Sequence, residues 1–319
     1  MNYQNPNQEE KFLHHILQIQ DELNLVIKNI ETIIMGKRKV IEEVLMAICA
    51  NGHVLLMDTP GVGKTLLSKA LAKSIHSHFR RIQFTPDLLP SDITGVNIFN
   101  QKTREFEFQS GPIFTNILLA DEINRAGPKT QSALLEAMEE RQVSIDNLQY
   151  NLHNFFFVIA TQNPVEHAGT YPLPAAQLDR FLVRLSLGYP DKDTELEILR
   201  SSSSIESPLN SINKVVKIEE VLKWQSACSR IYTSPKIDEY IVDLARATRE
   251  AGPSGSGVSP RASLMLKRVA KASALLDKRD YVIPDDIHRM IKQVFAHRMV
   301  SQYDGSDEIV DEILAKVTL

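Results

Sequence analysis

The segment 55–65, LLMDTPGVGKT, has the residue types of a phosphate-binding loop between a strand and a helix. The usual spacing is a glycine, any four residues, and then Gly-Lys-Ser or Gly-Lys-Thr. Gly63, Lys64 and Thr65 fit this spacing, whereas Asp58 stands in place of the opening glycine. An ordinary strand-to-helix turn that contains Gly-Lys-Thr is the alternative, but the position after a strand and before a helix favours a phosphate site.

Each part of this loop would contribute different chemistry. Backbone N–H groups of a glycine-rich turn bind phosphate oxygens, and the N-terminus of the following helix adds positive potential. Lys64 would reach the terminal phosphates, and the Thr65 hydroxyl would bind Mg²⁺. The residues expected to contact the nucleotide here are Pro60, Gly61, Val62, Gly63, Lys64, Thr65 and Leu66.

Two adjacent carboxylates follow the apolar segment 117–120 in ILLADEINRA. Carboxylates at the end of a buried strand are costly unless they meet a cation or water. Asp121 would complete the Mg²⁺ shell, and Glu122 would orient and deprotonate the attacking water. Alone, the pair could equally cap a helix. Together with the phosphate loop, it indicates a hydrolytic site.

A polar turn follows the next apolar segment, FFFVIA, at Thr161, Gln162 and Asn163. In a parallel sheet, ligands bind outside the carboxyl ends of the strands. Asn163 is therefore expected to hydrogen-bond the attacking water or the terminal phosphate. Its alternative role is that of a turn residue before Pro164.

Strands alternate with helices up to Tyr189-Pro190, and the rest of the chain is helical, with interruptions at SSSSIESPLN and AGPSGSGVSP. We predict helices at 11–31, 38–50, 64–77 and 128–140, strands at 53–57, 81–85, 117–120, 155–160 and 182–187, a short helix or turn at 86–91, and hairpin-like segments at 97–110 and 142–152. This alternation predicts an α/β fold with a parallel, doubly wound sheet, because parallel neighbours need crossover connections. We divide the chain into an N-terminal helical extension (1–32), an α/β nucleotide-binding domain (33–190) and a helical lid domain (191–319).

The composition sets broad limits on function. The 319 residues are 43% hydrophobic and 24% charged, as in ordinary globular proteins. The formal net charge of −4 gives no overall reason to expect nucleic acid as a partner, although it leaves room for a local basic patch. Cys49 and Cys228 lack metal-ligand spacing, which favours a reducing, cytoplasmic setting. We expect no signal peptide and no membrane span.

The phosphate loop, DEINRA, the asparagine after the next strand and LPAAQLDRF together resemble the MoxR family of AAA+ ATPases. The resemblance covers nearly the whole chain, from about residue 34 to the C-terminal helices. It implies an AAA+ P-loop NTPase core with a parallel sheet flanked by helices, followed by a small all-helical lid, and it implies ATP and Mg²⁺ as cofactors. It also implies a homo-oligomeric ring, commonly a hexamer, and inserts that correspond to 93–110 and 142–152 here.

The resemblance gives roles to two arginines. Arg180, in LDRF, resembles the arginine finger that reaches the nucleotide of the neighbouring subunit, and Arg261, in GVSPRA, resembles the lid arginine that contacts the phosphates. A guanidinium suits both roles because it makes bidentate contacts and stabilises charge in the transition state. Surface salt bridging is the alternative for each. The resemblance also implies that Gly36 and its neighbours lie beside the adenine.

The function implied by the resemblance is ATP hydrolysis by a chaperone-like remodelling or maturation factor for protein complexes. Its client would be a protein, with a von Willebrand factor A domain as one possibility. The alternative is a nucleic-acid-dependent AAA+ motor. The segment 142–148 argues against that alternative, because its tip carries Asp146 and no Lys or Arg. A third option, an ATP-binding scaffold with little turnover, depends on Asp58.

Asp58 is expected to point away from the phosphates. Aspartate tolerates turn conformations and can hydrogen-bond local N–H groups. The phosphates would contact residues 61–65, so the first position of the loop is taken as the least demanding one. We therefore predict that Asp58→Gly leaves ATP binding intact or modestly tighter.

Overall fold

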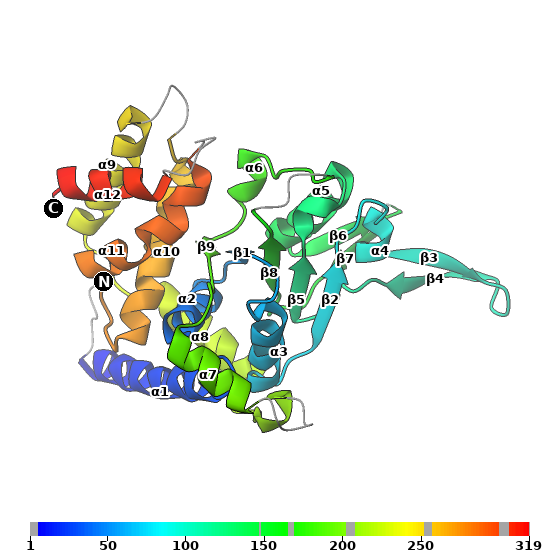
Figure 1. Ribbon diagram of the computed structural model, residues 1–319, viewed down its shortest axis with the longest axis horizontal. Helices are drawn as coiled ribbons and strands as arrows, with labels where there is room; N and C mark the ends of the chain where they lie inside the picture. The colour runs from blue at the N-terminus through cyan, green and yellow to red at the C-terminus, as the bar shows by residue number, and fades with distance from the viewer. Residues whose placement is uncertain are drawn as a thin grey trace.

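The computed structural model describes residues 6–146, 148–164, 169–201, 208–251, 257–299 and 306–318 (Figure 1). Most of the serine-rich and glycine-rich interruptions of the helical region lie outside these residues, as do Asn147 and part of the segment after Asn163. The predicted fold class is confirmed: a parallel sheet flanked by helices is followed by an all-helical region.

The sheet has five strands in the order β2-β5-β8-β1-β9, and each neighbouring pair is parallel. Its strands are β1 (Val54–Met57), β2 (Phe79–Gln83), β5 (Ile117–Asp121), β8 (Phe157–Gln162) and β9 (Val183–Leu185). The central strands are apolar except at their carboxyl ends, because helices cover both faces of a parallel sheet. All five carboxyl ends lie at one edge, here called the carboxyl edge, and all five amino ends lie at the opposite amino edge.

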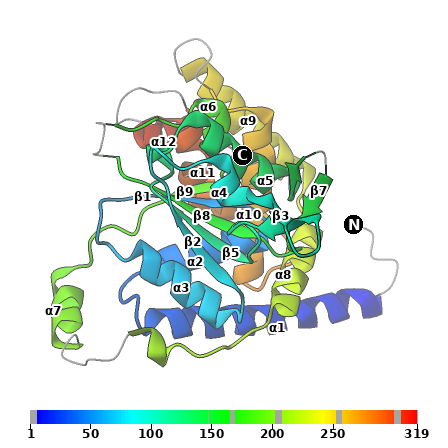
Figure 2. The same cartoon turned by 90° about the vertical axis from the view of Figure 1, so that its right-hand side faces the viewer.

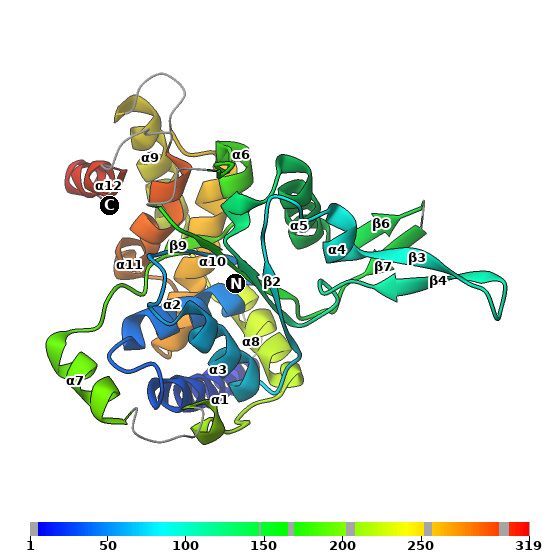
Figure 3. The same cartoon turned by 45° about the vertical axis from the view of Figure 1, so that its right-hand side comes forward.

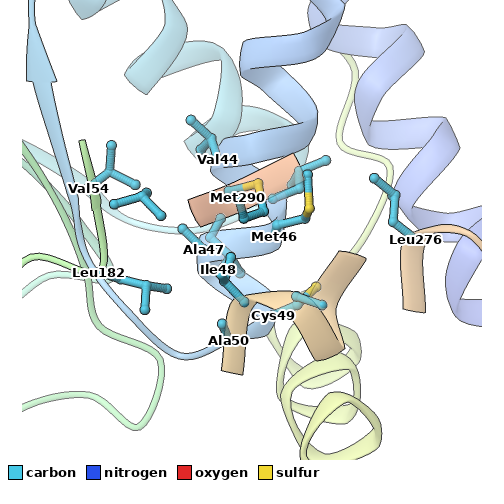
Figure 4. Packing of buried hydrophobic residues seen from close by; sticks show 14 of the residues in the cluster. Val44, Met46, Ala47, Ile48, Cys49, Ala50, Val54, Leu182, Leu276 and Met290 are labelled. Atoms are coloured by element: carbon cyan, nitrogen blue, oxygen red, sulfur yellow. The ribbon is translucent and has the colours of Figure 1, made fainter. Parts of the chain in front are cut away.

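The connections in this half of the chain are helical crossovers. They include α3 (Lys64–Ser74), α4 (Pro90–Thr94), α5 (Pro128–Glu140) and α6 (Ala175–Leu178), with a 3-10 turn at Ile123–Arg125, whereas α2 (Arg38–Cys49) precedes β1. Helix α2 is buried on most of its surface. Figure 4 shows residues of α2 packed near Val54 of β1, Leu182, Leu276 and Met290. One hydrophobic core therefore joins the sheet to the helical region.

Two antiparallel hairpins extend from the sheet side of the molecule (Figures 1 and 3). One consists of β3 (Gly95–Asn100) and β4 (Glu105–Ser110), and the other of β6 (Gln142–Ile145) and β7 (Leu148–Asn151). The rings of Phe108 and Tyr150 stack with centroids 4.1 Å apart, and Asn97 Nδ2 donates to Asp146 Oδ2 over 2.7 Å. These contacts hold the two hairpins side by side.

The helical region gathers against the other side of the sheet. It comprises α7 (Lys192–Ser201), α8 (Ile218–Arg230), α9 (Pro235–Ala251), α10 (Pro260–Leu276), α11 (Pro284–Phe295) and α12 (Ser306–Lys316), with 3-10 turns at Pro208–Ser211 and Ala296–Arg298. The N-terminal helix α1 (Pro6–Glu31) crosses beneath α2, α3, α8 and α10 and contacts all four (Figure 2). Its apolar face, which includes Ile16, Leu23 and Ile27, is fully buried. Helix α1 is thus part of the common core.

Three predicted elements were shifted along the sequence. Strand β2 begins at Phe79, two residues before its predicted start, because it pairs only with β5 and can expose Arg80 and Arg81. Strand β8 begins two residues after its predicted start, although Phe155 and Phe156 are buried. The short helix α4 was predicted four residues too early.

Candidate active site

The phosphate loop is open where a ligand would enter. Gly61 and Gly63 have φ values of +90° and +98°, a region that favours glycine. A Cβ atom added at either position would meet no heavy atom within 4 Å. Gly63 is also the N-cap of α3, so the first N–H groups of this helix face the loop. The geometry is therefore that of a preformed cradle for an anion.

Lys64 is folded over this loop. Its Nζ donates to the carbonyl oxygens of Asp58, over 2.8 Å, and Thr59, over 3.3 Å. The ammonium thus lies beside the cradle, where phosphate oxygens would compete for it. Thr65, the next residue, is half-buried in the first turn of α3.

Asp58 has an organising role that the sequence did not suggest. Its side chain is 5% exposed and points away from the cradle, as predicted. Oδ1 accepts from Ser186 Oγ over 2.6 Å and from the Gly188 N–H over 3.0 Å, and Oδ2 accepts from the Leu187 N–H over 2.8 Å. The view of this position as undemanding was therefore wrong, because the carboxylate fixes the loop to the chain as it leaves β9.

Asp121 is the last residue of β5. Strand β5 lies next to β8, which in turn lies next to β1, the strand that leads into the phosphate loop. Its Oδ1 accepts from Thr161 Oγ1 over 2.6 Å, and its Oδ2 accepts from Arg81 Nη2 over 2.6 Å and from Arg81 Nε over 3.0 Å. Both oxygens are thus held by donors, one of which is a full positive charge. A cation at this carboxylate would replace Arg81.

Glu122 has an unusual backbone conformation. Its φ of +56° is left-handed, which is uncommon for a residue other than glycine and clusters at functional sites. Its N–H donates to Thr161 Oγ1 over 2.8 Å. Its Oε2 accepts from Gln83 Nε2 over 2.7 Å and from Arg125 Nη1 over 3.0 Å. The carboxylate is thus fixed at the end of β5.

Asn163 lies at the same carboxyl edge. It follows Gln162, which is paired with Met57 at the end of β1, and it is half-buried. Since β8 lies between β5 and β1, Asn163 is placed between the acidic pair and the phosphate loop. The structure therefore brings together the predicted residues Lys64, Thr65, Asp121, Glu122 and Asn163.

The donor set at this edge fits Mg²⁺. The Thr65 hydroxyl and the Asp121 carboxylate offer hard oxygen atoms, and Mg²⁺ in nucleotide sites is held by one or two such groups together with phosphates and water. Among the residues that the structure describes, no three His, Cys, Asp or Glu side chains form a protein-only metal site. A metal shared with a nucleotide is the arrangement that these residues suit.

Gly36 lies near the same loop. A Cβ atom at Gly36, whose φ is +69°, would be 3.1 Å from Thr194 Oγ1 of α7. Lys37 Nζ donates to the Tyr189 carbonyl over 2.8 Å, and Thr59 Oγ1 donates to the Tyr189 hydroxyl over 3.0 Å. The segment before α2, the start of the loop and the segment after β9 thus meet, and the place of the adenine beside Gly36 stays a prediction.

Arg180 and Arg261 lie elsewhere. Arg180 precedes β9, and Arg261 is in the first turn of α10. Both line a cavity of about 270 Å³ with Gly52 and His53, which precede β1. This cavity is at the amino edge, so neither arginine reaches the phosphate loop of its own chain in this arrangement.

The amino-edge cavity is rich in positive charge. Arg141 and Arg268 also line it, and burial lowers the pKa of Arg141, with a further contribution from repulsion by Arg268. Burial also lowers the pKa of Arg268, and repulsion by Arg261 adds to this effect. His53 is fully buried and its pKa is lowered to about 3, chiefly by desolvation. Its Nδ1 accepts from the Val158 N–H over 3.0 Å, and Nε2 contacts the Met138 carbonyl over 3.2 Å, so the ring is neutral with the proton on Nε2.

The sequence alone did not reveal several side chains that contact the acidic pair. Arg81 and Gln83 are two positions apart on edge strand β2, so they share the face that meets Asp121 and Glu122. Their spacing was a usable signal, because alternate residues of a strand point the same way. Thr161 was noted only as part of a polar turn, although its hydroxyl contacts both acidic residues.

Comparisons with known proteins agree with this geometry. Residues 53–183 match the family model "ATPase family associated with various cellular activities (AAA)", and residues 246–317 match the AAA lid domain. The chain is 50% identical over 301 residues to the uncharacterized protein YeaC of Bacillus subtilis (strain 168), covering 92% of this chain and 94% of that protein.

Two further relatives are informative. The chaperone MoxR1 of Mycobacterium tuberculosis is 41% identical over 302 residues, covering 92% of this chain and 79% of that protein. A crystal structure of a candidate ATPase from Cytophaga hutchinsonii is 41% identical, with a TM-score of 0.86 and coverage of 98% of both chains.

Proposed function

Because this chain belongs to the MoxR family of AAA+ ATPases, we propose that it hydrolyses ATP at the carboxyl edge of its sheet. The observation that carries the proposal is the convergence there of an open phosphate cradle, Lys64, Thr65 and the pair Asp121 and Glu122. The likeness to a named chaperone supports a chaperone-like use of that energy.

Each of the residues at this edge would have a different role in ATP hydrolysis. Gly61, Gly63 and the start of α3 would bind the β- and γ-phosphates through N–H groups, and Lys64 would exchange its carbonyl partners for phosphate oxygens. Mg²⁺, held through Thr65 and Asp121, would neutralise charge that develops on the phosphates. Glu122 would accept a proton from the attacking water.

Asn163 and Glu122 would position that water between them. Gln83 and Arg125 both donate to Oε2 of the Glu122 carboxylate, so the water would be bound through the other oxygen, Oε1. The neighbouring amide of Asn163 would fix the direction of attack.

Hydrolysis would require a second chain. Arg180 and Arg261 lie at the amino edge, where they cannot contact the nucleotide of the same chain. A ring in which the amino edge of one chain faces the carboxyl edge of the next would bring both arginines to a neighbour's phosphates. We therefore propose a homo-oligomeric ring, with six subunits as the expected number.

The hairpin β3–β4 is the proposed contact with a protein client, including the von Willebrand factor A domain proteins that the family resemblance suggests. Phe99 and Phe106 face each other across it with centroids 5.3 Å apart and are 49% and 72% exposed. Exposed aromatic groups on a projecting element are typical of binding surfaces.

We place this work in the cytoplasm, where ATP is available and where the unpaired Cys49 and Cys228 stay reduced. Among the described residues, no helix has both the length and the apolar character needed to cross a membrane.

A nucleic-acid-dependent motor is the second candidate, and one observation favours it. The turn of the β3–β4 hairpin carries Lys102 and Arg104, whereas the β6–β7 turn carries Asp146. Glu105 and Glu107 follow on β4 and offset this positive charge. The charge balance of the hairpin therefore favours a protein client.

Phosphate release with Mg²⁺ and ATP, measured with and without DNA, tests these proposals. We expect Mg²⁺-dependent hydrolysis that DNA does not change. Strong stimulation by DNA would contradict the chaperone proposal.

A second experiment uses Glu122→Gln to trap the bound state. We expect this variant to bind ATP but to hydrolyse it at least about 100-fold more slowly, and to retain client proteins during purification. Glu140→Gln, at an exposed position of α5, is the matched control. Failure of the Glu122→Gln protein to bind ATP would contradict the mechanism.

A further inference from the structure

We propose that Glu139, in the last turn of α5, is a positioning residue that holds Arg180 and Arg261 together as one phosphate-receiving pair. This inference rests on the proposed function, in which both arginines act on the nucleotide of the neighbouring chain. It adds a residue that does not itself contact that nucleotide.

The two oxygens of one carboxylate bind the two guanidinium groups. Arg261 Nη1 is 2.7 Å from Glu139 Oε1, and Arg180 Nη1 is 3.0 Å from Glu139 Oε2. Arg180 Nη1 also donates to the Leu135 carbonyl, one turn earlier in α5, over 2.9 Å. Glu139 is one-third exposed and Arg180 and Arg261 are similarly accessible, so all three remain open to an incoming group.

The backbone next to each arginine is fixed by a second carboxylate. Asp179, which precedes Arg180, accepts from the buried Arg298 Nε over 2.8 Å and from Ser259 Oγ over 3.2 Å. Ser259 is the N-cap of α10, two residues before Arg261, and its Oγ accepts from the Ala262 N–H. The segment before β9 and the start of α10 are therefore joined close to both arginines.

Glu139 orders the two arginine side chains, which the backbone link does not do. Two guanidinium groups side by side repel each other, and long arginine side chains lose rotamer freedom when they are ordered. A carboxylate between them lowers that repulsion and orders both side chains before a phosphate arrives. Preorganised charge of this kind stabilises a transition state more than groups that must be gathered during the reaction.

Complementation between inactive chains tests the inference. Lys64→Ala removes the phosphate-binding lysine but leaves the arginines, whereas Arg180→Ala leaves the phosphate loop intact. If the arginines act across the interface, a mixture of the two variants regains activity at sites where an Arg180→Ala chain, the acceptor, faces a Lys64→Ala chain, the donor.

Glu139→Gln is then added to the donor or to the acceptor. We expect the donor Lys64→Ala/Glu139→Gln to restore about threefold to tenfold less activity, in kcat more than in KM, and the acceptor with Glu139→Gln to behave as before. Glu140→Gln in the donor is the control and should have no effect. Glu139 is accessible at the surface, and unchanged ATP binding by the acceptor that carries Glu139→Gln will show that chains with this substitution fold.

The outcomes separate this inference from its premise. Full restoration by the Glu139→Gln donor, or equal losses from donor and acceptor, would overturn the positioning role and leave the interchain arginines in place. No complementation between Lys64→Ala and Arg180→Ala would refute the interchain arginines themselves, and the inference would fall with them.

Discussion

Replacement of Asp58 by glycine is expected to weaken both the fold and ATP binding. The carboxylate is buried and accepts hydrogen bonds from Ser186, Leu187 and Gly188. This expectation reverses the one that the sequence alone suggested. Glycine would restore the usual loop spacing, yet it would leave two N–H groups and one hydroxyl without their acceptor.

The magnitude follows from these contacts. A hydrogen bond to a charged group contributes about 1.5–3 kcal/mol, and a buried unsatisfied donor costs about 1–3 kcal/mol. Partial solvation by water will reduce the sum, so we expect a loss of about 3 kcal/mol in the free energy of unfolding. With an unfolding entropy of about 2.1 cal/mol/K per residue, this corresponds to a fall of about 5 °C in Tm.

ATP affinity should fall with the order of the loop. We expect Kd for ATP to rise about tenfold in Asp58→Gly and about threefold in Asp58→Asn, which keeps one acceptor oxygen. Fluorescent-nucleotide titration and thermal unfolding measure the two effects. Asp243→Asn, at an exposed position of α9, is the matched control. An Asp58→Gly protein with unchanged Tm and equal or tighter ATP binding would refute this reasoning.

Three further predictions concern other parts of the site. Arg81→Ala should lower the Mg²⁺ concentration for half-maximal hydrolysis about threefold, because Arg81 occupies the Asp121 carboxylate; an unchanged Mg²⁺ titration would contradict this. Gly63→Ala should weaken ATP binding about tenfold, since φ of +98° costs an L-residue about 1–2 kcal/mol, and equal affinity would show that the loop relaxes freely. The low pKa of His53, about 3, means that only the unfolded chain takes up this proton as pH falls below about 6.5, so stability should decline towards pH 3 by up to about 1.4 kcal/mol per pH unit. His53→Gln should remove this part of the pH dependence of the free energy of unfolding, measured by urea unfolding, whereas the part that comes from buried His297 should stay. An unaltered pH dependence would contradict the role given to His53.

The carboxyl-edge site could be predicted from the sequence because its parts follow strands. Lys64, Asp121 and Asn163 each come after an apolar segment, and parallel strands bring such positions to one edge. The fold class followed from the same alternation. The amino-edge arginines needed the family resemblance, since nothing in their local sequence distinguishes them from other arginines.

The contacts that sequence reasoning missed are long-range ones. Asp58 binds residues about 130 positions later, and Glu139 meets Arg261 across 122 positions. No local pattern encodes either pairing, because the first depends on β9 lying beside β1 in the sheet and the second on how α10 docks beside α5. The place of α1 in the core was missed for the same reason, although its amphipathic pattern was evident.

The central claim is that one catalytic site needs two chains, and its most direct test is the ATPase rate per chain measured against chain concentration. Mass photometry on the same samples would report the oligomeric state. We predict that the rate per chain rises with assembly and falls to a low value where single chains predominate. Single chains that hydrolyse ATP at the full rate would contradict the claim.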